Sequence, residues 1–404
     1  MACICNLRLS HKIRNSVVSS LCFYRASHGF PKTCATPFPS RSLNHSSAKL
    51  KCSTLSVSVT GAFTWDDVVR ISEPESLPED SLDLTGFFEK VKICNRGSVK
   101  PPLHILFGSP RNSKSGRKKE PFGCLQEKQS EFLPFVMEDQ IVGYIHNVFA
   151  DHLRRFQDVF VFPEDNCYGG RIGHATLHPM LRKPEDRTSA VGDVIKSLAE
   201  ELIPGIRNEL YPVTSSFGAR VFFSLERAAA PYFGIKAYGV HMNGYVERDR
   251  QKLLWIGKRS PAKATYPGML DHLAAGGLPH GIACGENLVK ECEEEAGIPR
   301  SIADKAIPVG AVSYVDIDGY RYKRDVLFCY DLKLPESFRP ENQDGEVDSF
   351  KLIPVTHVAN IIRRTQFFKP NCSLVIMDFL FRHGYFSSGQ NSFSYLQAVS
   401  WTRT

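Results

Sequence analysis

The chain has 404 residues and a formal net charge of +7, and 42% of its residues are hydrophobic. This length allows two domains, and this composition is that of a folded globular protein rather than a disordered one. No run of about 18 apolar residues occurs, so neither a membrane-spanning segment nor a membrane partner is expected.

The segment before Asp66 contains no acidic residue, eight basic residues and many serines. Such a leader is typical of an organelle transit peptide, and we expect residues 1–55 to be one, disordered and cleaved near residues 50–60. A plain basic tail is the alternative. Without these eight residues the chain has 42 basic and 43 acidic residues. Because a nucleic-acid surface needs concentrated positive charge, no nucleic-acid partner is expected.

Residues 64–225 are predicted to form an N-terminal α+β domain. Thr64 followed by two acids predicts a helix start. Residues 108–128 are predicted to form a loop. The apolar segments of 132–148 lead into a stretch with helical spacing that ends at residue 156. Residues 189–203 are predicted to form an amphipathic helix. No phosphate-binding loop or nucleophile motif occurs in this part. We interpret the domain as a substrate-shaping or packing module.

Residues 226–395 are predicted to form a second, α/β domain. The pattern becomes rich in strands after Phe233, and a predicted helix ends at Gly297, a residue suited to a left-handed stop. The predicted strands are 235–241, 252–259, 307–315 and 325–332, and the predicted helices are 285–296, 355–363 and 373–383.

The most informative feature is a glycine-rich bend, 276–281, followed by an acidic helix. On this helix Glu294 and Glu295 share a face with Glu291, whereas Glu293 points toward solvent beside Lys290. Like charges at this spacing repel each other, and a hard cation with oxygen ligands, such as Mg²⁺, would reverse the sign of the interaction. The alternative is a solvated acidic face.

These residues resemble the Nudix box, written G-x5-E-x7-R-E-U-x-E-E-x-G-U, where U is a bulky aliphatic residue. The agreeing positions are Gly276, Glu291, Glu294, Glu295, Gly297 and Ile298. Cys292 stands at an aliphatic position, Ile282 replaces the first glutamate, and Lys290 replaces the arginine. In the family that glutamate and arginine help to hold the loop and helix together. Ile282 cannot form a salt bridge, and Lys290 cannot form a planar bidentate pair.

Three further segments extend the resemblance over residues 66–395. They are 205–211, 233–241 and 368–372. They resemble plant chloroplast Nudix hydrolases whose upstream domain is shared with fungal thiamine pyrophosphokinase-type proteins. The resemblance implies an α/β fold, a Nudix α/β/α sandwich with a mixed sheet, preceded by a smaller α+β domain. It also implies the chloroplast stroma as the location, with the mitochondrion as second choice.

The resemblance implies a metal site for Mg²⁺ or Mn²⁺. Its ligands would be the Gly276 carbonyl and the carboxylates of Glu291, Glu294 and Glu295. Either Glu291 or Glu295 would activate the attacking water, and Lys290 would anchor the helix or contact phosphate. Glu346 is the first candidate for an additional acidic ligand from a later loop, ahead of Asp344 and Asp348. That loop could also be only an acidic turn.

Three functions are compatible with these residues. The first is Mg²⁺-dependent hydrolysis of the diphosphate linkage in a nucleoside diphosphate derivative or a thiamine diphosphate-like compound. The second is a Nudix-fold binding module or sensor that holds a diphosphate ligand without cleaving it, which Ile282 and Lys290 favour. A thiamine kinase is the weakest, because the additional domain of the fungal relatives is not found. The expected partner is a small molecule, and the sequence gives no oligomeric state.

Overall fold

The computed structural model describes residues 63–74, 83–97, 131–163 and 173–386. The predicted leader and the predicted loop at 108–128 lie outside these ranges. All described residues belong to one compact unit. Among them, no helix combines the length and the apolar character that a bilayer crossing requires.

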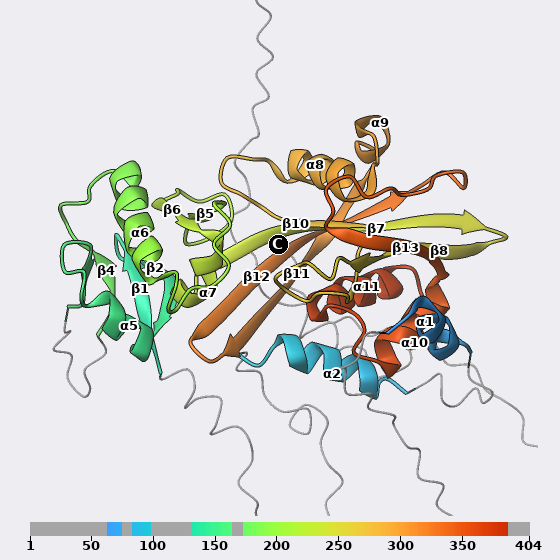
Figure 1. Cartoon of the computed structure of the whole chain (residues 1–404), viewed down its shortest axis with the longest axis horizontal. Helices are drawn as coiled ribbons and strands as arrows, with labels where there is room; N and C mark the ends of the chain where they lie inside the picture. The colour runs from blue at the N-terminus through green and yellow to red at the C-terminus, as the bar shows by residue number, and fades with distance from the viewer. Residues whose placement is uncertain (1–62, 75–82, 98–130, 164–172, 387–404) are drawn as a thin grey trace, which may run out of the picture. The chain divides into compact units, whose positions relative to one another are not determined.

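A mixed sheet forms the centre of the C-terminal half (Figure 1). Its strand order is β11 (Ile307–Asp318), β12 (Arg321–Lys333), β7 (Lys236–Arg248), β8 (Gln251–Arg259) and β13 (Val347–Pro354). β12 and β7 are parallel, and the other neighbouring pairs are antiparallel. The short strands β10 (Ala274–Gly277) and β9 (Leu270–Asp271) pair with β7 and β8. The predicted mixed sheet is confirmed.

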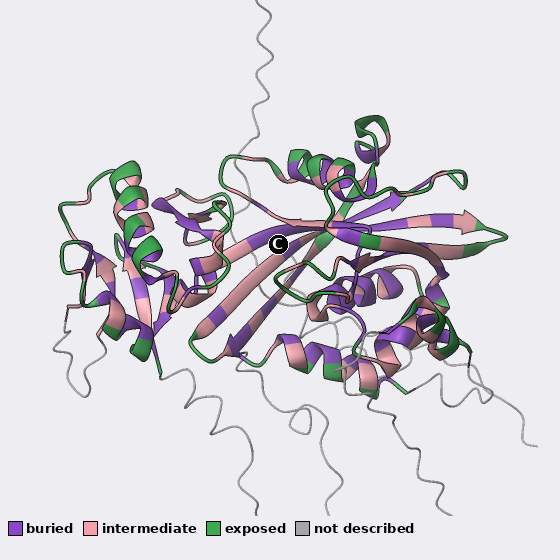
Figure 2. Ribbon diagram, in the orientation of Figure 1, coloured by how far each residue is buried: buried purple, intermediate pink, exposed green. Residues whose placement is uncertain are grey.

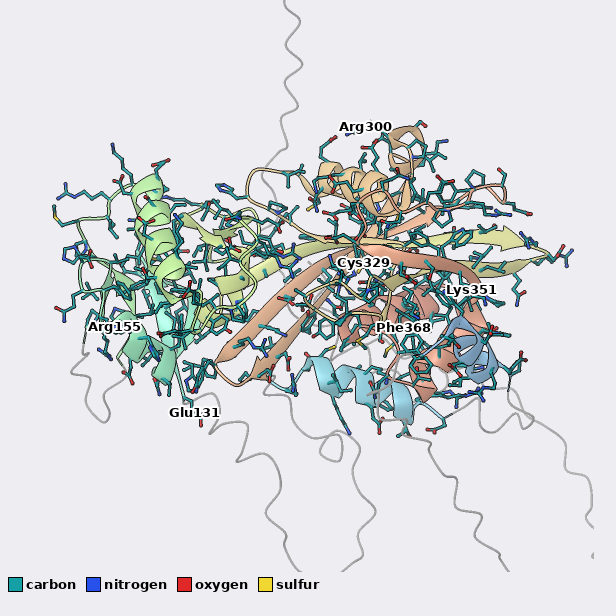
Figure 3. The ribbon with its side chains drawn as sticks, in the orientation of Figure 1. Glu131, Arg155, Arg300, Cys329, Lys351 and Phe368 are labelled. Atoms are coloured by element: carbon teal, nitrogen blue, oxygen red, sulfur yellow. The ribbon has the colours of Figure 1, made fainter. Side chains whose placement is uncertain are left out.

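Helices cover both faces of this sheet (Figure 1). On one face lie α8 (Cys284–Ala296) and the short α9 (Arg300–Ala303), and on the other lie α10 (Val355–Arg364) and α11 (Pro370–Arg382). Figure 2 shows that the surfaces facing the sheet are buried. Cys329 and Phe368, labelled in Figure 3, belong to the apolar core on the α10–α11 side. The predicted α/β/α sandwich is therefore confirmed.

Two N-terminal helices join this C-terminal core. They are α1 (Trp65–Ser72) and α2 (Thr85–Cys94). The α1 helix begins at the predicted place, because Thr64 and Asp67 cap each other reciprocally. Val68 and Phe87 pack in the same cluster as residues of α10 and α11. The prediction of an N-terminal domain at residues 64–225 includes these two helices. In the structure they pack against α10 and α11 of the C-terminal half instead.

The upstream half has an apolar core of its own, which includes Phe135, Phe149, Leu225 and Phe233. Its elements are β1 (Phe132–Met137), β2 (Gln140–His146), α5 (Asn147–Leu153), β3 (Phe160–Val161), β4 (Thr176–Leu177), α6 (Pro184–Leu198), β5 (Leu210–Val213), β6 (Phe223–Glu226), η2 (Arg227–Ala229) and α7 (Ala230–Phe233). The helix predicted at 189–203 is α6, which starts earlier, because Pro184 suits the first helical turn, and ends earlier, at Leu198.

The upstream half passes directly into the sheet. Gly234 caps α7 with a φ of 58°, a left-handed conformation that glycine adopts without steric cost, and β7 begins two residues later. A Cβ at Gly143 of β2 would overlap the carbonyl of Phe233. The close backbone contact between β2 and α7 therefore requires glycine at both positions.

Candidate active site

The acidic helix α8 is fixed by a buried stripe and a glycine stop. Leu288, Val289 and Cys292 pack into the core between α8 and the sheet. Gly297 ends the helix with a φ of 63°, and the N–H of Ile298 donates to the carbonyl of Cys292 at 2.9 Å. This pattern satisfies carbonyls that the helix end leaves free. The face of α8 beside this stripe, which carries Glu291, Glu294 and Glu295, lines one cavity of about 1090 Å³.

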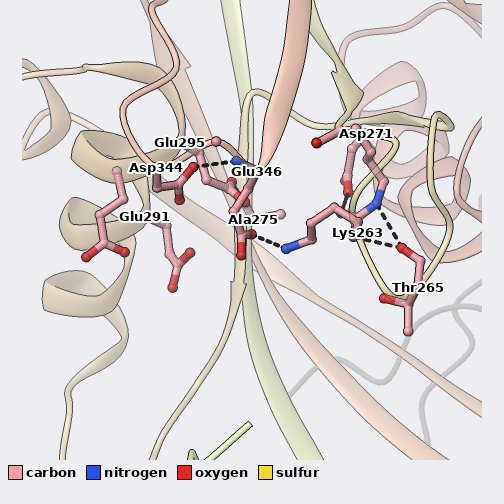
Figure 4. Close-up of polar contacts among 12 residues, drawn as sticks. Lys263, Thr265, Asp271, Ala275, Glu291, Glu295, Asp344 and Glu346 are labelled. Carbon is pink, nitrogen blue, oxygen red and sulfur yellow. Dashed lines mark hydrogen bonds and ion pairs between the residues drawn. The ribbon is translucent and has the colours of Figure 1, made fainter. Parts of the chain in front are cut away.

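Glu295 is the most deeply buried of the three predicted carboxylates. It is 7% exposed, and its Oε2 accepts a hydrogen bond from the N–H of Ala275 in β10 at 2.8 Å. Burial raises the pKa of this carboxyl group well above its usual value. Figure 4 shows Glu295 between α8 and the strands, on the same side as Glu346.

Glu291 lies against the glycine bend. Its side chain is 14% exposed, and burial raises its pKa to about 7, although nearby Lys290 lowers it in part. A Cβ at Gly276 would overlap the carboxyl group of Glu291. The glycine of the sequence pattern is therefore required for space here, because any side chain at 276 would displace the glutamate.

Glu294 and Lys290 form an ion pair at the cavity edge. The Nζ of Lys290 donates to Glu294 at 2.7 Å and lies 3.7 Å from Glu291. The side chain of Glu294 is 46% exposed. Glu286 pairs with Arg300 at 2.9 Å on the surface. Glu294 and Lys290 both line the cavity that the other two glutamates line.

The later acidic loop also reaches this cavity. Asp344 and Glu346 line it, but Asp348 does not. Glu346 pairs with Lys263 (Figure 4), and its N–H donates to Asp344 at 2.8 Å. Burial is the largest single influence and raises the pKa of Glu346, but the hydrogen bond and charge of Lys263, together with the charges of Arg259 and Arg207, outweigh it, so the pKa is lowered. Burial raises the pKa of Asp344. The loop thus adds carboxylates to the predicted group.

The glycine bend is held by the upstream half. The N–H of His280 donates to the carbonyl of Leu210 in β5 at 2.8 Å, and its Nδ1 lies 2.7 Å from the hydroxyl of Ser224 in β6. Asn287 of α8 donates to the carbonyl of Gly277 at 2.8 Å. These hydrogen bonds connect the glycine bend to β5, β6 and α8. In the Nudix box a glutamate and an arginine help to hold the loop and helix together, and here Ile282 and Lys290 stand in their places.

A buried polar layer lies beneath Glu295. Asp271 accepts from Arg259 at 2.7 Å, from Lys369 at 3.3 Å and from the thiol of Cys372 at 2.7 Å. The Nδ1 atoms of His241 and His272 are 3.1 Å apart, beside Cys372. These groups join β7, β8, β9 and the start of α11, and the buried Nε2 of His272 has no hydrogen-bond partner among the described residues. The members of this layer come from distant segments, so no local pattern in the sequence indicates it.

The upstream half also contributes polar side chains to the cavity. The cavity that the glutamates of α8 line is also lined by Arg207, Glu209, Tyr211 and Arg227. Three of them lie in 205–211, a segment that the sequence analysis used only for resemblance. The mixture of charged and aromatic residues in this segment is the sequence signal for a place in the cavity. No local pattern in the sequence shows that β5 approaches Gly277.

Comparisons with known proteins point to one family. A family model described as "NUDIX domain" matches residues 237–370, and one described as "Domain of unknown function (DUF4743)" matches residues 117–237. An Arabidopsis thaliana protein named "Nudix hydrolase 20, chloroplastic" is 63% identical over 345 residues, covering 85% of this chain and 83% of the relative. "Nudix hydrolase 24, chloroplastic" of the same plant is 60% identical over 81% of each chain.

An uncharacterized protein of Saccharomyces cerevisiae is 39% identical over 212 residues, covering 49% of this chain and 61% of the yeast protein. The upstream domain thus occurs together with a Nudix domain in this chain, and the likeness extends to a fungal protein, as the resemblance implied. Because the likeness to the plant proteins covers more than four fifths of both chains, the protein belongs to the Nudix hydrolase family, whose members cleave diphosphate linkages.

Proposed function

We propose that this chain is a Mg²⁺- or Mn²⁺-dependent hydrolase of the diphosphate linkage in a nucleoside diphosphate derivative or a thiamine diphosphate-like compound. One observation carries the proposal. Glu291, Glu294 and Glu295 line a single cavity with Gly276 and Glu346; Glu295 is buried, and the side chain of Glu291 is only 14% exposed. Buried, adjacent carboxylates are costly when ionised, and a divalent cation relieves that cost.

The donor set fits a hard cation. The group is made of carboxylate oxygens and the Gly276 carbonyl, and Mg²⁺ takes a few such ligands together with substrate phosphate oxygens. We assign Glu291, Glu294, Glu295 and Gly276 as the ligands, with Glu346 as an additional one. When bound, the ion neutralises charge that develops on the phosphoryl oxygens and acidifies a bound water.

The chain itself supplies the base. Hydrolysis forms a bond between a water oxygen and phosphorus, breaks the bond to the bridging oxygen, and transfers a water proton to a carboxylate. We assign this role to Glu291, because a base with a pKa of about 7 suits neutral pH. Glu295 is the second choice, because its Oε2 already accepts a hydrogen bond from Ala275. We place Lys290 as the residue that orients Glu294.

A screen of nucleoside and thiamine diphosphates tests the proposal, with the leader removed and product release measured in Mg²⁺ and in Mn²⁺. Glu294→Gln and Glu295→Gln should each lower kcat at least about a hundredfold, because the metal clamp contributes several kcal/mol. Glu293→Gln is the matched control, since its exposed side chain lies outside the cavity. Parent-like hydrolysis by both site variants would disprove the proposed site.

A second function, a diphosphate sensor, is favoured by the pair between Lys290 and Glu294, which occupies one ligand carboxylate. Calorimetry that finds tight ligand binding, with no product after long incubation in Mg²⁺ or Mn²⁺, would select it. We also propose a chloroplast location, which the names of the plant relatives support. Import of the full chain into isolated chloroplasts, compared with a chain starting at residue 56, tests it.

A further inference from the structure

The upstream half places two arginines at the cavity, and the sequence pattern assigned neither. Arg227 follows β6, and Arg207 precedes β5. Both line the cavity that Glu291 and Glu295 line. A Cβ at Gly277 would lie 3.1 Å from the guanidinium carbon of Arg227. Arg227 therefore lies beside the glycine bend, next to the position where a diphosphate must approach the glutamates.

Arg227 is held in a fixed orientation. Its Nη1 donates to Glu209 at 2.6 Å, and its backbone N–H donates to the carbonyl of Glu209 at 2.8 Å. Its guanidinium carbon lies 5.6 Å from the ring centre of Tyr211, within the range of a cation–π contact. The side chain is 34% exposed. Within the described ranges the guanidinium makes no other hydrogen bond, so most of its five N–H donors remain available to a ligand.

The other cations of the cavity differ in their partners. Lys263 pairs with Glu346, and Lys290 pairs with Glu294. Arg207 has no ion pair among the residues that the structure describes; its backbone N–H donates to Glu226 at 2.9 Å. Arg227 lies beside Gly277, and Glu291 packs against the neighbouring Gly276. Unlike Lys263 and Lys290, Arg207 and Arg227 do not pair with a predicted ligand.

We propose that Arg227, assisted by Arg207, binds non-bridging oxygens of the substrate's diphosphate group, so that the upstream half forms part of the active site. The inference rests on the proposed function, because it concerns the same cavity. A planar guanidinium matches two phosphate oxygens at once, whereas Lys290 can offer only a point charge. Glu209 and Tyr211 act as positioning residues, because they contact the guanidinium and hold it.

The test is calorimetric titration of the full chain with methylenediphosphonate, a diphosphate analogue that cannot be hydrolysed, in Mg²⁺. Arg227→Ala should weaken binding about ten- to a hundredfold, the loss expected when charged hydrogen bonds are removed. Arg227→Lys should give an intermediate loss, and Arg207→Ala a smaller one. Arg220→Ala is the matched control, because Arg220 pairs with Glu138 at 2.7 Å outside the cavity.

Three outcomes separate this inference from the proposed function. If the parent binds the analogue through Arg227 but hydrolyses no diphosphate, the inference stands and the hydrolase proposal fails. If the parent hydrolyses and Arg227→Ala and Arg207→Ala both bind like the parent, the inference is wrong and the hydrolase proposal stands. A parent that does not bind the analogue overturns the inference. Mn²⁺ affinity, measured for each variant, should stay unchanged, because neither arginine bonds to a proposed metal ligand.

Discussion

In the metal-free protein, Glu291→Gln should increase stability at neutral and alkaline pH. Burial raises the pKa of this carboxyl group from 4.5 to about 7 in the folded state. The folded chain therefore keeps a proton that the unfolded chain releases between these values. Stability contributed by this group is lost as the pH rises from 4.5 through 7, because the ionised form is disfavoured in the fold.

The size of the effect follows from the pKa difference. One pKa unit corresponds to about 1.4 kcal/mol. The interval from 4.5 to about 7 therefore gives a penalty of about 3 kcal/mol above neutral pH. With a side chain only 14% exposed, Glu291 is poorly screened by solvent. Glutamine cannot ionise, so the variant should gain up to this amount relative to the parent at pH 8 and much less at pH 5.

Urea unfolding in a chelating buffer at pH 5, 6.5 and 8 measures the difference between parent and variant. Glu293→Gln is the control, because it removes an exposed carboxylate from the same helix. Addition of Mn²⁺ at pH 8 should stabilise the parent more than Glu291→Gln, since ligands bind the ion in their deprotonated form. A free-energy difference that stays constant from pH 5 to pH 8 would refute the reasoning.

Three further results are expected. Gly276→Ala should lower Mn²⁺ affinity about tenfold or more, because the new methyl group displaces Glu291. Gly285→Ala is the control, because the space around Gly285 is open and the affinity should stay unchanged. Equal affinities of the two variants would contradict the proposed ligand role. Gly143→Ala should destabilise the chain in urea by about 1–3 kcal/mol through overlap with Phe233, and a neutral effect would show that β2 can move away. Burial lowers the pKa of His241 and His272 below 6.5, so the folded chain keeps them neutral and stability should fall as the pH drops below 6.5. Replacing His272 with asparagine should reduce that acid sensitivity in urea titrations, and an unchanged pH dependence would argue against it.

The sequence predicted the acidic helix well, because local signals determine it. The expected range 285–296 agrees with α8, which starts one residue earlier, and Gly297 is the left-handed stop. Helical spacing also placed the three glutamates on one face. It could not give their depth, since burial depends on β10 and on the loop before β13, which approach from elsewhere in the chain. Glu295 is buried and Glu294 is half exposed, although the two are adjacent in sequence.

Long-range contacts account for what the sequence analysis did not predict. The strand β13 was not predicted. Residues 344–348 were predicted to be a loop that supplies an acidic ligand, with a plain acidic turn as the alternative, whereas the strand forms by pairing with β8. The grouping of α1 and α2 followed chain order, whereas their apolar faces pack against α10 and α11. Arg227 has no motif around it, and its importance appears only when η2 is seen beside Gly277.

The contacts between the upstream half and the glycine bend explain why the chain tolerates its two departures from the Nudix box, Ile282 and Lys290. A partly exposed glutamate–arginine pair stabilises a structure by about 0–1 kcal/mol. In this chain the bend is held by His280 bonding to Leu210 and Ser224, and by Asn287 bonding to Gly277. Each such hydrogen bond contributes about 1 kcal/mol. Together they can replace the missing pair, so Ile282 and Lys290 are tolerated as long as β5 and β6 remain packed against the bend.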